Sequence, residues 1–105
     1  MVSSLERRRL SRVPIKLPLR YKLDDVWHEG HSGNLGLGGM FILSEEGPAY
    51  GTKVEIEVEL PGSSEVSSLP AVVRWVSTGG FGAQFLMLGA RTTRALVTAL
   101  DQRVA

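Results

Sequence analysis

Alternation of apolar and polar residues recurs between residues 15 and 86, and it predicts short β-strands that each bury one face. The alternation runs from residue 15 to residue 23 and is uninterrupted from residue 53 to residue 60. Pro14 and Pro18 place the early part of the first segment at a sheet edge, because proline donates no ladder hydrogen bond. Further strands are predicted at residues 26–32, 40–43, 71–76 and 81–86, with turn residues between them.

The period of the pattern changes after residue 90. Leu96, Val97 and Leu100 recur at the spacing of one helix face, which predicts an amphipathic helix over residues 91–103. About six short strands followed by one helix indicate a mainly β protein, a six-stranded antiparallel β-barrel covered by a C-terminal α-helix. We expect a flexible arm over residues 1–12 and one barrel domain, with its helix, over residues 13–105.

A glycine-rich bend interrupts the strand-like pattern near the middle of the chain. Four glycines lie between residues 33 and 39, together with Asn34. Glycine lets another group come close to the backbone, so such a bend marks a bulge, a tight turn or a ligand contact. A plain β-turn between two strands explains the glycines equally well when they are considered alone.

Basic residues gather at the start of the chain, although the net charge is only +1. A basic arm on a near-neutral domain favours a specific anionic partner. The alternative for such an arginine cluster is a solvated, disordered tail. Seven of the twelve basic residues lie within the first 22 positions: Arg7, Arg8, Arg9, Arg12, Lys16, Arg20 and Lys22.

Composition predicts the size class and the cellular location of the protein. The chain has 105 residues, of which 43% are hydrophobic and 22% charged, so it reads as one globular domain. It has no cysteine, no secretory signal pattern, and no apolar run near the roughly 20 residues that span a bilayer. We expect a cytoplasmic protein without membrane insertion, either a monomer or a homodimer.

Catalytic and metal chemistry find little support. His28 and His31 are three residues apart on a predicted strand, so they point to opposite faces and converge poorly on a metal. Glu55, Glu57 and Glu59 share the solvated face of a strand, where charged residues are expected, and no carboxylate pair lies in the apolar setting that acid–base catalysis needs. We therefore expect no enzyme activity, no metal and no cofactor.

Two segments favour binding. Arginine suits phosphate through its planar fork and stacks on flat bases, which makes Arg8 and Arg12 candidate ligand contacts. The bend at residues 34–39 offers backbone N–H groups to an anion. Together they fit a phosphorylated, aromatic ligand such as a nucleotide. An RNA-binding barrel is less favoured, because it needs exposed aromatic residues and most aromatic residues here are expected in the core.

These two segments resemble the motifs of a known family. Residues 6–14, ERRRLSRVP, are similar to the N-terminal RxxxR motif of the PilZ family, with Arg8 and Arg12 as its arginines. Residues 34–39, NLGLGG, resemble the second motif, [D/N]xSxxG, with Asn34 and Gly39 in register. Residues 72–76 and 80–85 also resemble the end of that barrel, so the likeness covers residues 6 to about 100.

The resemblance implies a receptor for the bacterial second messenger cyclic di-GMP. In that family the arginine arm covers the ligand and the second motif contacts its guanine edges, which implies an adaptor that signals to a protein partner, for example in motility control. It implies no DNA or RNA partner. The ligand-binding residues implied are Arg8, Arg12, Asn34, Gly36 and Gly39, with Arg7 and Arg9 as additional contacts.

One position departs from the family pattern. Gly36 replaces the motif serine, and the loss of one hydroxyl contact weakens binding by roughly tenfold. The alternative function is therefore a divergent PilZ module that binds no nucleotide and acts as a protein-interaction adaptor, for example in motility or polarity control. A Gly36 at positive φ would also resist a serine side chain.

Overall fold

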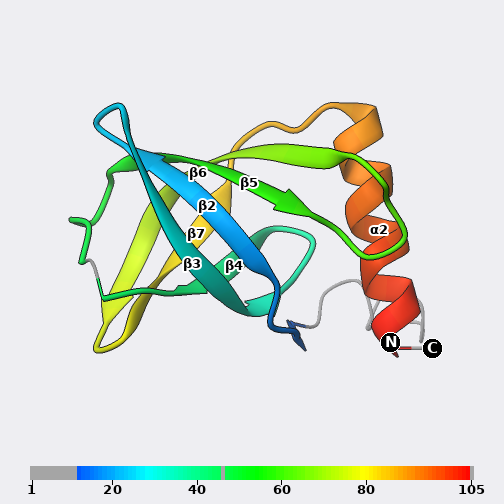
Figure 1. The fold of residues 1–105 in the computed structure, drawn as a ribbon, viewed down its shortest axis with the longest axis horizontal. Coiled ribbons are helices and arrows are strands. Elements are labelled where there is room, and N and C mark those ends of the chain that lie inside the picture. Colours follow the sequence, from blue (N-terminus) through cyan, green and yellow to red (C-terminus); the bar gives the residue numbers. More distant parts are fainter. Residues whose placement is uncertain (1–11, 46, 105) are drawn as a thin grey trace, which may run out of the picture.

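The computed structural model describes residues 12–45 and 47–104, which form seven strands and one helix (Figure 1). The elements are β1 (Val13–Pro14), β2 (Pro18–Leu23), β3 (Val26–Leu35), β4 (Gly39–Leu43), β5 (Lys53–Glu59), β6 (Val66–Ser77), β7 (Gly80–Phe85) and α2 (Ala90–Val104).

The strands form one antiparallel sheet that closes on itself. Its order is β1-β3-β2-β5-β6-β7-β4, and an additional pairing of β3 with β4 closes the ring. β1 is a short extra strand that pairs with the end of β3. The predicted mainly β fold, a six-stranded antiparallel barrel with a C-terminal helix, is confirmed.

The predicted first strand, residues 15–23, is wrong in its early part, because β2 begins only at Pro18. The reason is the buried side chain of Ser32. Its hydroxyl donates to the carbonyl of Ile15 at 2.6 Å and accepts from the amide of Leu17 at 2.9 Å. A side chain thus satisfies backbone groups that a regular ladder would pair.

Two other strands are longer than their sequence patterns predict. β3 continues into the glycine-rich stretch and ends at Leu35, and β6 begins at Val66, before residue 71 where the apolar run starts. Residues 66–70 contain two serines and Pro70, so their strand signal is weak. These residues are held in a strand by pairing with β5, from Val66 opposite Glu59 to Pro70 opposite Glu55, and not by their own β-propensity.

The core lies inside the barrel and under the helix. Tyr21 and Phe81 are fully buried and meet edge to face, with ring centres 5.3 Å apart. α2 packs against β6 and β1 and adds Leu96, Ala99 and Leu100 to the core. This confirms the predicted amphipathic helix, which stands beside one end of the barrel in Figure 1.

The position of His28 is explained by packing against the core. His28 stacks on the buried ring of Tyr21, with ring centres 5.4 Å apart. Among the described residues no group of three side chains is placed to hold a metal ion. Within the same residues, no helix has the length and apolarity needed to cross a membrane.

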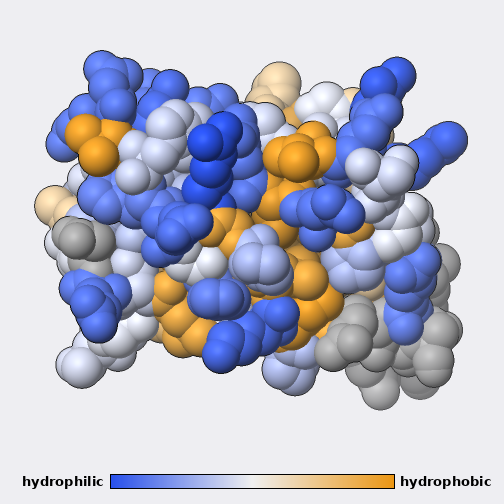
Figure 2. Space-filling model, in the orientation of Figure 1, coloured by the Kyte–Doolittle hydropathy of each residue, from blue (hydrophilic) through white to orange (hydrophobic). Residues whose placement is uncertain are grey.

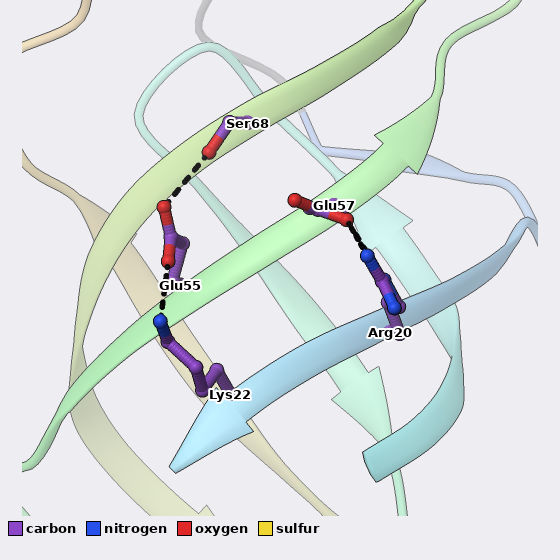
Figure 3. Close-up of polar contacts among 5 residues, drawn as sticks. All are labelled: Arg20, Lys22, Glu55, Glu57 and Ser68. Carbon is purple, nitrogen blue, oxygen red and sulfur yellow. Dashed lines mark hydrogen bonds and ion pairs between the residues drawn. The ribbon is translucent and has the colours of Figure 1, made fainter. Parts of the chain in front are cut away.

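The outer face of β2 and β5 is a ladder of paired charges (Figure 3). Arg20 contacts Glu57 at 2.7 Å, and Lys22 contacts Glu55 at 3.4 Å. Both pairs are direct cross-strand neighbours, so two of the basic residues near the N-terminus are already partnered on the barrel. Figure 2 shows this side of the molecule as mostly hydrophilic, with apolar patches toward its centre.

Candidate ligand-binding site

A row of four residues crosses the outer face of β3, β4, β7 and β6. Asn34 pairs with Phe41, Phe41 pairs with Gly82, and Gly82 pairs with Trp75. Direct cross-strand neighbours lie side by side on one face of a sheet. The row therefore places an amide, a phenyl ring, a bare backbone position and an indole next to one another.

A bulge in β3 turns Asn34 to this outer face. The register shifts between Ser32 and Asn34, which makes Gly33 the extra residue. Ser32 is fully buried and faces the interior. In a regular strand Asn34, two residues later, would also face inward, because side chains alternate with period two. The bulge reverses that direction.

A second bulge does the same for Trp75. The register of β6 shifts between Val73, which is fully buried, and Trp75, which is 41% exposed. Arg74 is the extra residue, so Trp75 lies outside opposite Gly82. Bulges recur next to functional sites because they redirect side chains in this way.

Glycines of β7 form the floor beneath both rings. A Cβ atom at Gly82 would lie 1.8 Å from Cε2 of Trp75, and one at Gly80 would lie 2.7 Å from Cε2 of Phe41. Both distances are far below carbon–carbon contact, so a side chain at either position excludes the ring. Here glycine is required for close approach, with the indole and the phenyl ring resting on the strand backbone.

Arg12 lies over this row. Its Nη1 donates to Oδ1 of Asn34 at 2.9 Å, and its guanidinium carbon lies 5.2 Å from the centre of the Trp75 ring. Its Nη2 would be 3.1 Å from a Cβ at Gly39, so the glycine leaves room for the arginine. Although the side chain is exposed, partial burial of the guanidinium lowers the pKa of Arg12. Arginine nevertheless stays charged at neutral pH.

Gly36 lies in the turn that joins β3 to β4. Its N–H donates to the carbonyl of Gly39 at 2.8 Å, and this bond closes the turn. The glycines with positive φ in the described residues are Gly51, Gly62 and Gly79, so Gly36 is not among them. Its φ therefore does not exclude a residue with a Cβ atom, and the residue itself is buried.

The structure brings together three of the predicted site residues, Arg12, Asn34 and Gly39, and places Gly36 in the adjacent turn. The remaining predicted contacts, Arg7, Arg8 and Arg9, lie outside the described residues, as does the rest of the predicted arm before residue 12.

Sequence reasoning missed Phe41 and Trp75. The expectation that most aromatic residues occupy the core is wrong, since of the seven only Tyr21, Phe81 and Phe85 are buried. The two bulges and the β7 glycines explain the difference. One sequence feature could have indicated the two rings: Gly80 and Gly82 lie two residues apart in a strand, and glycine within a strand marks a place where another group approaches the backbone closely.

An arginine held over an exposed indole, beside an amide and a glycine-rich turn, makes this outer face of the barrel the candidate ligand-binding site. The sequence matches the PilZ domain model over residues 6–102. The chain therefore belongs to the PilZ domain family, as its motifs predict. No curated protein sequence matches it.

Solved PilZ structures share the fold. The chain is similar to the PilZ domain of Escherichia coli YcgR, solved with cyclic di-GMP, at 22% identity over 93% of this chain and 94% of that one, with a TM-score of 0.73. The PilZ domain of CeSA from a cellulose-synthesizing bacterium is 20% identical over 90% of this chain and 99% of that one, with a TM-score of 0.72. Bacillus subtilis MotI/DgrA, an inhibitor of motility, is 18% identical over 99% of this chain and 56% of that one, with a TM-score of 0.75.

Proposed function

We propose that the protein is a cyclic di-GMP receptor that binds the nucleotide on the outer face of β3, β4, β7 and β6. The observation that carries the proposal is the placement of Arg12 between Asn34 and the exposed ring of Trp75. Cyclic di-GMP combines phosphates with purine bases, and this face offers a partner to each. Membership of the PilZ family and the cyclic di-GMP in the YcgR structure support the proposal.

Each residue of the face has a definite role in this proposal. Arg12 makes charge-assisted contacts to a phosphate and presents its planar guanidinium to a base. Trp75 offers one ring face for stacking, a contact worth about 1–3 kcal/mol per base. The amide of Asn34 donates to the acceptors on the guanine edge. The glycine floor keeps the indole flat against the strand, so little ordering entropy is lost on binding.

The signal passes to a protein partner through the arm. Arg8, with Arg7 and Arg9 beside it, closes over the bound nucleotide, and the covered face then binds or releases the partner. The structural likeness to MotI, an inhibitor of motility, favours a partner in motility control, by analogy of fold. We propose a cytoplasmic adaptor without enzymatic activity of its own.

A second candidate function is a divergent PilZ module that binds no nucleotide. The observation that favours it is Gly36, where the family motif has a serine. Against it stand the retained Arg12, Asn34 and Gly39, which the fold brings together on one face of the barrel.

Titration calorimetry with cyclic di-GMP, and with GTP as the control nucleotide, tests the proposal. We expect Arg12→Ala to cost about 2 kcal/mol, roughly 30-fold in Kd, because it removes a charge-assisted contact. The matched control is Arg91→Ala on α2, which removes the same charge from a side chain that is 91% exposed. It should bind like the wild type.

Two results contradict the proposal in different ways. If the folded wild type binds no cyclic di-GMP, the divergent module is the better description. If Arg12→Ala and Arg91→Ala weaken binding equally, the attraction is a general effect of net charge, which added salt would remove.

A further inference from the structure

A second group of side chains, Tyr50, Arg74 and Gln84, lies next to the Arg12 site and belongs to neither sequence motif. Arg74 is the extra residue of the β6 bulge. Its Nε donates to Oε1 of Gln84 at 2.8 Å, and its Nη1 donates to the hydroxyl of Tyr50 at 3.4 Å. Its guanidinium carbon is 6.0 Å from the centre of the Tyr50 ring, within the range of a cation–π contact.

Strand register fixes where this group lies. Gln84 is the direct cross-strand neighbour of Gly39, over which Arg12 passes, and adjacent strands are about 4.8 Å apart. Gln84 also follows Gly82 by two residues, so both lie on the outer face of β7. Arg74 directly precedes Trp75 in β6. The second group therefore borders the first along two strands.

The second group repeats the chemistry of the first: a guanidinium, an aromatic ring and a side-chain amide. Tyr50 is 67% exposed, which leaves its ring open to a ligand. Arg74 makes hydrogen bonds to neutral groups, so its charge remains to be matched by an anion. The ion pairs among the described residues involve other basic side chains, in the pairs Arg20–Glu57, Lys22–Glu55 and Arg91–Glu65.

We propose that Tyr50, Arg74 and Gln84 form a second subsite, which holds the second nucleotide half of a cyclic dinucleotide. Arg74 contacts its phosphate, Tyr50 stacks on its base, and the amide of Gln84 contacts the base edge. The inference rests on the proposed function, because the Arg12 site holds the first half. Two like subsites side by side select a ligand with two purine nucleotides over a mononucleotide.

The test is calorimetry with cyclic di-GMP on the full chain and on Arg74→Ala, Tyr50→Ala and Tyr50→Phe. We expect Arg74→Ala to weaken binding by roughly tenfold or more. Tyr50→Ala should weaken it by roughly 5- to 150-fold through loss of stacking, while Tyr50→Phe keeps the ring and most of the affinity. Arg91→Ala is the charge control. Melting temperatures show that each variant is folded.

The outcomes separate the two proposals. Loss of affinity in both Arg74→Ala and Tyr50→Ala, with Tyr50→Phe near the wild type, supports the second subsite. Wild-type affinity in Tyr50→Ala overturns it, even when Arg74→Ala binds weakly, because Arg74 then acts by charge alone. In that case the effect of Arg12→Ala still supports the receptor. A wild type that binds no cyclic di-GMP removes both proposals together.

Discussion

Replacing Gly82 by alanine perturbs the binding face at one point. The new Cβ would lie 1.8 Å from Cε2 of Trp75, 2.1 Å from Cζ2 and 2.3 Å from Cδ2. Carbon atoms in contact stay about 3.5–4.0 Å apart, so the indole has to move by more than roughly 1 Å. Trp75 is 41% exposed, which lets the ring swing toward solvent while the barrel remains closed.

The loss of affinity follows from the contacts that the displaced ring gives up. Stacking on a base is worth about 1–3 kcal/mol, and the contact with Arg12 is worth about 0.5–1 kcal/mol at an exposed site. Their sum, about 1.5–4 kcal/mol, corresponds to a roughly 10- to 1,000-fold weaker Kd for cyclic di-GMP. The protein should stay folded and melt a few degrees lower, because the indole loses its packing on Gly82 and Arg12.

Calorimetry and thermal melting measure both effects, and Gly89→Ala, which lies outside the proposed site, is the matched control. A Cβ at Gly89 meets nothing within 4 Å, and this glycine is exposed without a positive φ. It should bind like the wild type. The variant Gly82→Ala/Trp75→Ala should bind no worse than Trp75→Ala alone, because the two changes remove the same ring. Wild-type affinity in Gly82→Ala would refute the assignment of Trp75 to the site.

Two further predictions concern the turn and the core beside the site. Ser32→Ala should lower the free energy of unfolding in urea by about 1–3 kcal/mol, because the carbonyl of Ile15 and the amide of Leu17 lose their hydrogen-bond partner. Equal losses in Ser32→Ala and in the exposed Ser68→Ala would contradict this reasoning. Gly36→Ser should tighten cyclic di-GMP binding by up to about tenfold in calorimetry at an unchanged melting temperature, since the backbone there has no positive φ. A lower melting temperature without a gain in affinity would count against it.

Much of the fold can be predicted from the sequence because its causes are local. Period-two alternation over residues 53–60 matches β5, and the helical spacing of Leu96 and Leu100 matches the buried face of α2. The resemblance to the two PilZ motifs likewise predicts Arg12, Asn34 and Gly39 as site residues. Each of these signals is contained within one short stretch of chain.

The aromatic residues of the proposed binding face, and the direction of its side chains, are decided by the tertiary structure. The direction of Asn34 and Trp75 depends on bulges, and a bulge exists only relative to the strand it pairs with. The indole lies flat because Gly82, on a neighbouring strand, has no side chain. The contact of Arg74 with Tyr50 joins residues 24 positions apart. Such arrangements follow from register between distant segments, which the periodicity of a single strand does not encode.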